Sequence, residues 1–258
     1  MNNFRDDVKG VILAGGSGTR LYPLTKIVSK QLLHIYNKPM IYYPLSVLVN
    51  SGVKNVMIIT TPEDQESFKN LLNNGSQWGI EIEYAVQEKP EGIAQALIIS
   101  EQWVDKMKTI LMLGDNLFFG PDINNIIRRS IDLNDGATIF GYKVPDPERF
   151  GVIQFDENKN VLSIEEKPEK PNSNWAVTGL YIYDGEVGSY AKKLKKSNRG
   201  EYEITDINNI YLKQKKIRLE FLDENYTWLD TGTFDSLLEA SNYVKKFHRE
   251  FKDKIIFD

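Results

Sequence analysis

The chain has 258 residues, of which 41% are hydrophobic and 26% are charged, a balance typical of a globular protein rather than a disordered or membrane one. Its net charge of −4 gives no electrostatic reason to expect nucleic acid as a partner, and the lack of cysteine excludes disulfides and thiolate chemistry. Because the sequence shows neither a signal peptide nor a stretch apolar enough to cross a membrane, we expect a cytoplasmic protein that does not bind membranes.

The first predicted element is a buried strand from Val11 to Leu13, followed by a glycine-rich loop and Arg20. A loop without Cβ atoms can bring its backbone N–H groups close to an anion, and Arg is well suited to grip phosphate oxygens. A dinucleotide-binding loop would need a third glycine where Leu21 stands, and a Walker loop would need Gly-Lys-Ser/Thr. Neither is present, so the stretch favours another kind of phosphate loop, with a turn whose glycines serve packing as the alternative.

The first half of the chain continues with alternating strands and helices. The expected strands are 55–60, 80–86, 109–113 and 137–144, and the expected helices are 41–49, 62–73, 92–103 and 123–133. This order predicts an α/β fold with a Rossmann-like, doubly wound, mostly parallel sheet. Strand 109–113 would deliver Asp115 to the carboxyl end of the sheet, where ligands collect in such folds.

The second half breaks this alternation. The expected strands are 151–156, 161–166, 175–183 and 215–222, and the expected helices are 185–196, 204–213 and 233–251. The first three strands follow one another without a helix, so we expect a smaller antiparallel region over the mouth of the site. No repeat or linker forces a boundary, which predicts a single domain over residues 1–258 with halves at about 8–145 and 146–241.

Five ordered blocks of sequence resemble one known family. Gly15 to Thr25 matches the signature of the sugar-1-phosphate nucleotidylyltransferases without a departure. The other blocks resemble the glucose-1-phosphate thymidylyltransferase branch, and they are residues 29–33, 113–116, 165–168 and 228–233. The resemblance implies transfer of a thymidylyl group from dTTP to glucose 1-phosphate by in-line displacement. Its products would be pyrophosphate and dTDP-glucose, the starting point for deoxysugars such as rhamnose.

The resemblance also implies a nucleotide site. Its expected residues are Leu13, Gly15, Gly16, Ser17, Gly18, Thr19, Arg20, Gln87, Pro90, Gly92 and Asp115. The expected catalytic residues are Arg20, Lys30 and Lys167, with the first two binding the triphosphate. Such a reaction needs alignment and charge neutralisation rather than a nucleophile, which agrees with a chain that has no Cys and two His. A surface Arg and a solvated Lys are the alternatives.

Asp115 and Asp230 are predicted to hold Mg²⁺, because this ion takes one or two carboxylates together with phosphate and water oxygens. Alternatively, Asp115 caps a turn and Asp230 organises the start of the last helix. Gln87 is expected to read the edge of the pyrimidine. Thymine and uracil share that edge and differ by one methyl group, worth ~1 kcal/mol, so the residues do not decide between them.

The second half is expected to bind the sugar phosphate. The residues implied by the resemblance are Asn116, Gly151, Glu166, Lys167, Val177, Tyr181 and Arg199. Glu166 would accept hydrogen bonds from sugar hydroxyls, and Lys167 would pair with the phosphate. Phe150 stands where the family often has Tyr, and His34 stands where it usually has Pro, which we interpret as a loop substitution.

The expected partners are therefore dTTP and glucose 1-phosphate, and longer relatives add C-terminal helices used in a tetramer and a regulatory nucleotide site. The short C-terminus argues against that tetramer and against feedback inhibition, and it leaves open a homo-oligomer of another kind. Two other functions fit less well. One is uridylyl or cytidylyl transfer to a hexose 1-phosphate, and the other is a non-catalytic sugar-nucleotide sensor, which should have lost the charged residues that this chain keeps.

Overall fold

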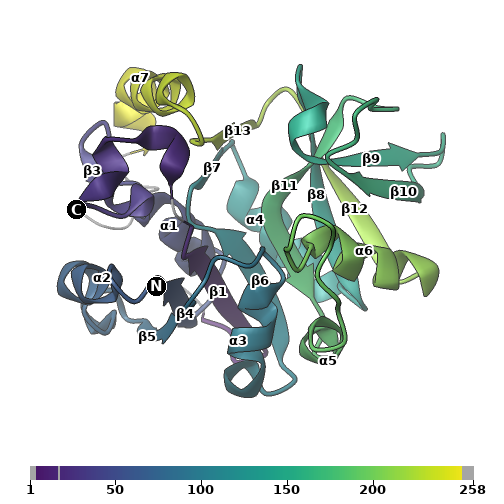
Figure 1. The fold of residues 1–258 in the computed structure, drawn as a ribbon, viewed down its shortest axis with the longest axis horizontal. Helices are drawn as coiled ribbons and strands as arrows, with labels where there is room; N and C mark the ends of the chain where they lie inside the picture. The colour runs from purple at the N-terminus through teal and green to yellow at the C-terminus, as the bar shows by residue number, and fades with distance from the viewer. Residues whose placement is uncertain (1–3, 17, 252–258) are drawn as a thin grey trace.

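A computed structural model describes residues 4–16 and 18–251, with side chains described up to residue 247 (Figure 1). The strands are β1 (Val8–Ala14), β2 (His34–Ile35), β3 (Lys38–Pro39), β4 (Asn55–Thr60), β5 (Glu81–Val86), β6 (Lys108–Leu113), β7 (Asn116–Phe119), β8 (Ala137–Lys143), β9 (Gly151–Phe155), β10 (Val161–Glu166), β11 (Trp175–Tyr183), β12 (Ile217–Leu222) and β13 (Thr227–Asp230). The helices are α1 (Tyr42–Asn50), α2 (Gln65–Leu72), α3 (Gln95–Val104), α4 (Ile123–Leu133), α5 (Val187–Ala191), α6 (Ile204–Lys213) and α7 (Phe234–Phe251).

A mixed sheet forms the centre of the molecule, with nine strands within the described part of the chain. Strands β5, β4, β1 and β6 are parallel neighbours in that order, and β8 pairs in parallel with β12. Strand β11 runs antiparallel between β6 and β8, and the β9–β10 hairpin extends the sheet at the opposite side from β5 (Figure 1). The predicted α/β fold is thus confirmed, with its antiparallel strands continuous with the parallel core.

The sheet is buried on both faces, as the uninterrupted apolar run of β1 predicts. Because side chains alternate along a strand, Ile12 points into the cluster that contains α1, α4 and α7. Its neighbour Val11 points into the cluster that contains α3, α5 and α6. Strand β1 is therefore fixed from both sides, and its carboxyl end is a rigid base for the glycine-rich loop. Within the described residues, no helix combines the length and apolarity that a membrane crossing requires.

Most predicted elements are observed, and five keep their predicted bounds to the residue, namely β4, β10, β11, α4 and α6. The helix expected over 185–196 is wrong in length, because α5 ends at Ala191. Four of the five residues from 192 to 196 are lysines, and their mutual repulsion at helical spacing disfavours continuation. The short strands β7 and β13 were not predicted, and they carry the centre of the site.

Candidate active site

An open cleft of about 680 Å³ lies at the carboxyl ends of β1 and β6 and extends to β9, β10 and β11. Its wall combines segments from both halves of the chain. The predicted residues that line it are Leu13, Gly16, Arg20, Gln87, Pro90, Gly92, Asp115, Asn116, Gly151, Glu166, Lys167, Val177, Tyr181, Arg199 and Asp230. The fold therefore gathers into one cavity side chains from nearly the whole length of the sequence.

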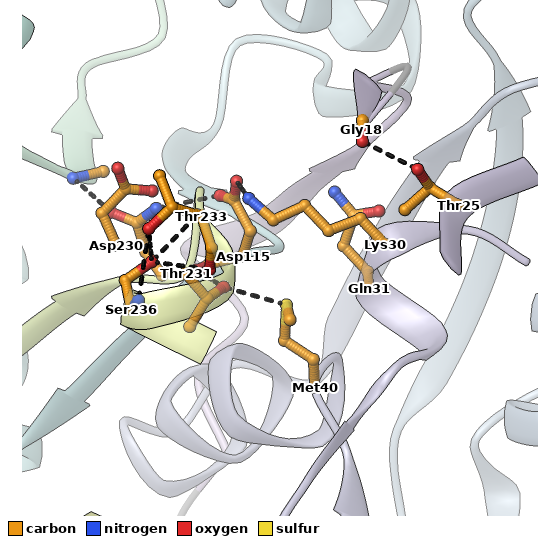
Figure 2. A network of polar contacts seen from close by, with 12 residues as sticks. Gly18, Thr25, Lys30, Gln31, Met40, Asp115, Asp230, Thr231, Thr233 and Ser236 are labelled. Atoms are coloured by element: carbon orange, nitrogen blue, oxygen red, sulfur yellow. Dashed lines mark hydrogen bonds and ion pairs between the residues drawn. The ribbon is translucent and has the colours of Figure 1, made fainter. Parts of the chain in front are cut away.

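The predicted residues that do not line the cleft are Gly15, Gly18, Thr19 and Lys30, and Ser17 lies outside the described residues. Gly18 has left-handed backbone, with φ of +59°, and its carbonyl accepts a hydrogen bond of 2.8 Å from the Thr25 hydroxyl. Lys30 is buried, and its ammonium group extends toward Asp115 (Figure 2). The hydrogen bond thus ties Gly18 to Thr25 within the loop, and Lys30 acts on the cleft through its contact with Asp115.

Two carboxylates meet in the cleft because β7 and β13 pair as an antiparallel ribbon. Asp230 lies directly opposite Asn116 in this ribbon, which brings it beside Asp115. Thr231 secures the arrangement, since its hydroxyl donates to the Asp115 carbonyl at 2.8 Å and its N–H donates to the same carbonyl at 3.3 Å (Figure 2). Both carboxylates are thus fixed by backbone pairing and by a buried threonine rather than by mobile loops.

Asp115 is paired with the ammonium group of Lys30, with 2.5 Å between Nζ and Oδ2. Its other oxygen accepts a hydrogen bond of 2.9 Å from the Asn116 amide. Burial raises the pKa of Asp115, but the charge and hydrogen bond of Lys30 and the bond from Asn116 outweigh it. The pKa of this carboxyl therefore lies below its ordinary value, and Asp115 is ionised at neutral pH.

Asp230 is in a different electrostatic position, although its side chain is similarly shielded. Burial and the charge of Asp115 raise its pKa above the ordinary value, and the nearby cations reduce this effect without cancelling it. Its ion pair with Arg149 is longer, at 3.3 Å, and Arg149 makes a closer pair of 2.6 Å with Asp146. Asp230 is thus the carboxylate whose negative charge is less fully compensated by the protein.

Arg149 and Thr205 belong to this site and were not predicted. Arg149 lines the cleft and directly precedes Phe150 and Gly151, which the sequence comparison did single out, so their block could have indicated it. Arg20 was predicted, and its guanidinium group lies against Gly232, where an added Cβ would be 3.1 Å from Nη2. Two arginines therefore approach the carboxylate pair from different elements.

The opposite end of the cleft carries a second group of charges. Arg199 pairs with Glu201 at 3.0 Å and with Glu166 at 3.4 Å, and the Thr205 hydroxyl donates to Glu166 at 2.5 Å. Lys167 follows β10 with φ of +44°, a backbone conformation that non-glycine residues seldom adopt. Such strain is frequent at functional sites, and here it turns the chain directly after Glu166 into the cleft.

The start of α7 is organised by Thr233 and Ser236 rather than by Asp230. The Thr233 N–H donates to the Ser236 hydroxyl at 3.0 Å, and the Ser236 N–H donates to the Thr233 hydroxyl at 3.2 Å (Figure 2). These reciprocal bonds satisfy donors at the helix start in the manner of a capping motif. The helix-capping alternative for Asp230 therefore has no support in the observed contacts.

The carboxylate pair has the donor chemistry of a magnesium site. In the described part of the chain there is no group of three or more His, Cys, Asp or Glu residues placed to hold a metal ion. Mg²⁺ usually takes one or two protein carboxylates and completes its octahedron with water and phosphate oxygens, so Asp115 and Asp230 suffice in number and kind. The raised pKa of Asp230 also indicates negative charge that a cation would compensate.

Comparisons with known proteins agree with this geometry. A model of the nucleotidyl transferase family matches residues 9–246. The glucose-1-phosphate thymidylyltransferase of Xanthomonas campestris pv. campestris is 56% identical over 92% of this chain and 80% of its own length. That of Neisseria gonorrhoeae is 53% identical over 92% of this chain and 83% of its own. That of Mycobacterium tuberculosis is 49% identical over 94% of this chain and 84% of its own. A Bacillus anthracis structure assigned as a glucose-1-phosphate thymidylyltransferase, in complex with sucrose, is 42% identical with a TM-score of 0.86, covering 92% of this chain and 95% of that one.

These matches and the site define the class of the protein. The chain belongs to the nucleotidyl transferase family, whose model covers nearly all of it. Within this family it belongs with the glucose-1-phosphate thymidylyltransferases, as the five sequence blocks predicted. A UDP-glucose pyrophosphorylase structure that is only 24% identical, with a TM-score of 0.82, shares the fold.

Proposed function

We propose that the chain transfers a thymidylyl group from dTTP to glucose 1-phosphate and releases pyrophosphate, with Mg²⁺ as cofactor. The oxygen of the sugar phosphate attacks the α-phosphorus as the bond to pyrophosphate breaks. The observation that carries this proposal is the pair of carboxylates, Asp115 and Asp230, in one cleft that also carries four cationic side chains, namely Arg20, Arg149, Lys167 and Arg199. These cations can bind two anionic substrates, and a divalent ion held by the two carboxylates would neutralise part of the charge that the substrates bring together.

At the nucleotide end, Arg20 binds the β- and γ-phosphates and stabilises the charge that grows on them as pyrophosphate leaves. Lys30 acts in a different manner from the direct phosphate contact that its motif suggests. Its buried ammonium group holds Asp115 ionised and oriented at 2.5 Å. Gln87 contacts the base, and Gly92 lines the same cleft, packed so closely against Tyr202 that an added Cβ would lie 2.5 Å from the Tyr202 carbonyl.

Asp115 and Asp230 are the residues that would hold the metal ion, and Asp115 is already ionised for that role. When bound, Mg²⁺ would neutralise phosphate charge and polarise the α-phosphate. The protein contributes the fixed positions of both carboxylates, through the β7–β13 ribbon and the Thr231 hydrogen bonds. Asp230 and Asp146 both pair with Arg149, so Arg149 keeps a partner in Asp146 when the Asp230 carboxylate turns to a metal ion.

At the sugar end, Lys167 and Arg199 bind the phosphate of glucose 1-phosphate, and Glu166 accepts hydrogen bonds from the sugar hydroxyls. The Thr205 hydroxyl fixes the orientation of Glu166 with a hydrogen bond of 2.5 Å. Phe150 packs edge-on against Trp228, with ring centroids 5.1 Å apart, and gives this end an apolar wall. Because Phe150 has no hydroxyl, it cannot make the polar contact that a tyrosine would offer a sugar.

The test is a matrix of triphosphates against sugar 1-phosphates, with Mg²⁺ present and pyrophosphate release as the readout. We expect the highest kcat/KM with dTTP and glucose 1-phosphate and no release after Mg²⁺ is removed with EDTA. If no pair of substrates releases pyrophosphate, the proposed enzymatic activity is refuted. A higher kcat/KM with UTP than with dTTP would refute only the thymidylyl assignment.

The remaining expectations about the setting of the protein are also proposals. Water-soluble phosphate substrates and the absence of cysteine support a cytoplasmic location. A single domain with a nucleotide half at about 8–145 and a sugar-phosphate half at about 146–241 agrees with a cleft whose two ends belong to these ranges. Light scattering of the purified chain would determine whether it forms a homo-oligomer.

A further inference from the structure

Gln87 is part of a chain of hydrogen bonds that runs away from the cleft. Its Nε2 atom donates to Oε1 of Gln95, at the start of α3, at 2.6 Å. The same Oε1 accepts a bond of 3.0 Å from the backbone N–H of Glu91. Gln95 Nε2 in turn donates to the Glu91 carboxylate at 3.3 Å, and Lys196 pairs with the other oxygen of that carboxylate at 2.5 Å.

The backbone N–H of Glu91 determines the polarity of this chain. A backbone N–H can only donate, so the Gln95 atom that it contacts must be the oxygen. Gln87 shares that oxygen, so the Gln87 atom facing it must be the NH₂ group. The orientation of both side-chain amides therefore follows from one peptide group, whichever way each amide might be turned by itself.

The carbonyl oxygen of Gln87 is consequently directed the other way, toward Gly15, which directly precedes the cleft-lining Gly16. An added Cβ on Gly15 would lie 2.3 Å from this Oε1 atom, which shows how closely it approaches the loop. Gln87 is buried, with 2% of its surface exposed, so a rotation of its amide would have to break the bond to Gln95 in a dry environment. Because Gln87 lines the cleft and its NH₂ group is held by Gln95, we infer that its oxygen is the atom available to a ligand there.

Glu91 is itself held in place. Its carbonyl accepts a bond of 2.7 Å from the Tyr202 N–H, and the Ala94 N–H donates to the Tyr202 carbonyl at 3.1 Å. Gly92 between them has φ of +105° and lies so close to Tyr202 that no Cβ would fit. The loop that carries the Glu91 N–H is therefore fixed by hydrogen bonds to Tyr202, which lies far away in the sequence.

The geometry points to Gln95 as a positioning residue that selects the base by fixing the acceptor of Gln87, an inference that rests on the proposed role of Gln87. Thymine and uracil present an N3–H donor beside a carbonyl, which matches an amide whose oxygen is fixed toward the base. Cytosine presents an N3 acceptor beside an amino donor, which the reversed amide would match. Gln95 would thus favour imide bases over cytosine without touching the nucleotide.

The experiment compares binding of dTTP, dUTP and dCTP to the full chain by calorimetry, with Mg²⁺ present and glucose 1-phosphate absent so that no turnover occurs. In Gln95→Met the Gln87 amide is free to turn, so the preference for dTTP over dCTP should fall about tenfold. The preference for dTTP over dUTP should not change, because both bases share the imide edge. In steady-state kinetics with glucose 1-phosphate, the Gln95→Met variant should use dCTP better than the wild type does, mainly through a lower KM for dCTP.

Two variants separate positioning from packing. Gln95→Glu keeps an acceptor for both the Gln87 amide and the Glu91 N–H. Its second oxygen replaces the donor to the Glu91 carboxylate, whose charge Lys196 compensates, so a folded Gln95→Glu protein should retain the wild-type preference. Gln102→Met makes the same change at an exposed position of α3 and should also retain it. If Gln95→Met does not fold, Gln95→Asn removes the reach of the side chain and keeps its polarity, and it should relax the preference in the same way.

The inference is overturned by a folded Gln95→Met protein with the wild-type preference, or by a Gln95→Glu protein that loses it. Equal binding of dTTP and dCTP by the wild-type chain would also overturn it. Failure of the proposed function gives a different result. A wild-type chain that prefers dTTP and dUTP over dCTP, yet releases no pyrophosphate, would support the positioning role and refute the catalytic one.

Discussion

The carboxyl group of Asp230 lies beside a second, ionised carboxyl group in a partly buried position, and this placement carries a cost in stability. Burial and the Asp115 charge raise the pKa of Asp230 in the folded protein. A carboxyl whose pKa is higher folded than unfolded lowers the stability of the folded state once the pH exceeds the unfolded-state pKa. The cost is absent well below that pKa, where both states are protonated. The proposed use of Asp230 as a metal ligand therefore opposes stability at neutral pH.

Asp230→Asn removes this cost and one expected metal ligand together. In EDTA at neutral pH we expect a Tm equal to or above that of the wild type, with the difference shrinking as the pH falls below the ordinary Asp range. Turnover with Mg²⁺ should fall roughly a hundredfold or more, because a metal ligand is lost. Thermal unfolding from pH 7 to pH 3 and pyrophosphate release measure the two effects. Asp135→Asn, at a side chain that is 97% exposed, is the control, and a parallel loss of Tm and turnover in Asp230→Asn would contradict this reasoning.

Two adjacent glycines of the loop differ in what surrounds them. A Cβ on Gly15 would lie 2.3 Å from Gln87 Oε1, whereas a Cβ on Gly16 would meet nothing within 4 Å. Gln87 is held by Gln95, so it cannot move aside without losing a hydrogen bond. Gly15→Ala should therefore reduce the free energy of unfolding by about 1–3 kcal/mol, while Gly16→Ala should change it by less than about 1 kcal/mol. Urea unfolding compares the two variants, and equal effects would argue against the contact.

At the scale of elements, the sequence predicts best what is local. The apolar runs of β1, β4 and β6 and the spacing of α4 lie within a dozen residues, so periodicity alone finds them. The β7–β13 ribbon has no such signal, since its strands are four residues long and far apart in the chain. Motif resemblance could indicate Asp115 and Asp230. It could not indicate the hydrogen bonds that hold them in place or support the site, namely those from Thr231 to the Asp115 carbonyl, from Thr205 to Glu166 and from Gln87 to Gln95. These contacts depend on tertiary packing, which no local pattern records.

Loss of the Thr231 hydroxyl in the β7–β13 ribbon should weaken the proposed metal site. Thr231→Val keeps the volume of a fully buried side chain and removes its bond to the Asp115 carbonyl. We expect a loss of about 1 kcal/mol in the free energy of unfolding. Affinity for Mn²⁺, used as a paramagnetic probe for the Mg²⁺ site, should fall about tenfold or more, because a group that orients a ligand is lost.

Thr227→Val makes the same chemical change at the far end of β13 and serves as the matched control. It should leave Mn²⁺ affinity at the wild-type value, as judged by electron paramagnetic resonance of the free ion. If both variants bind Mn²⁺ as the wild type does, the Thr231 bond does not position the carboxylates.

At the scale of the whole molecule, the cleft joins two regions that are connected by the central sheet and by the separate β7–β13 ribbon. The parallel strands β1 and β6 supply the proposed nucleotide end, and β9, β10 and β11 supply the proposed sugar end. Arg20 stands at the first end, while Lys167 and Arg199 stand at the second. A ligand bound across this cleft contacts both regions in the folded state and neither in the unfolded state, so binding should stabilise the whole chain.

This linkage gives a prediction that combines ligand and metal. With Mg²⁺ and dTTP at a hundred times its Kd, the free energy of unfolding should rise by about 2.7 kcal/mol. For a chain of this size that corresponds to a rise in Tm of roughly 5–10 °C. In EDTA the triphosphate would face Asp115 and Asp230 without an intervening cation, so most of the shift should disappear. Glucose without its phosphate is the control and should leave Tm unchanged, whereas an equal dTTP shift with and without EDTA would show that the two carboxylates hold no metal ion.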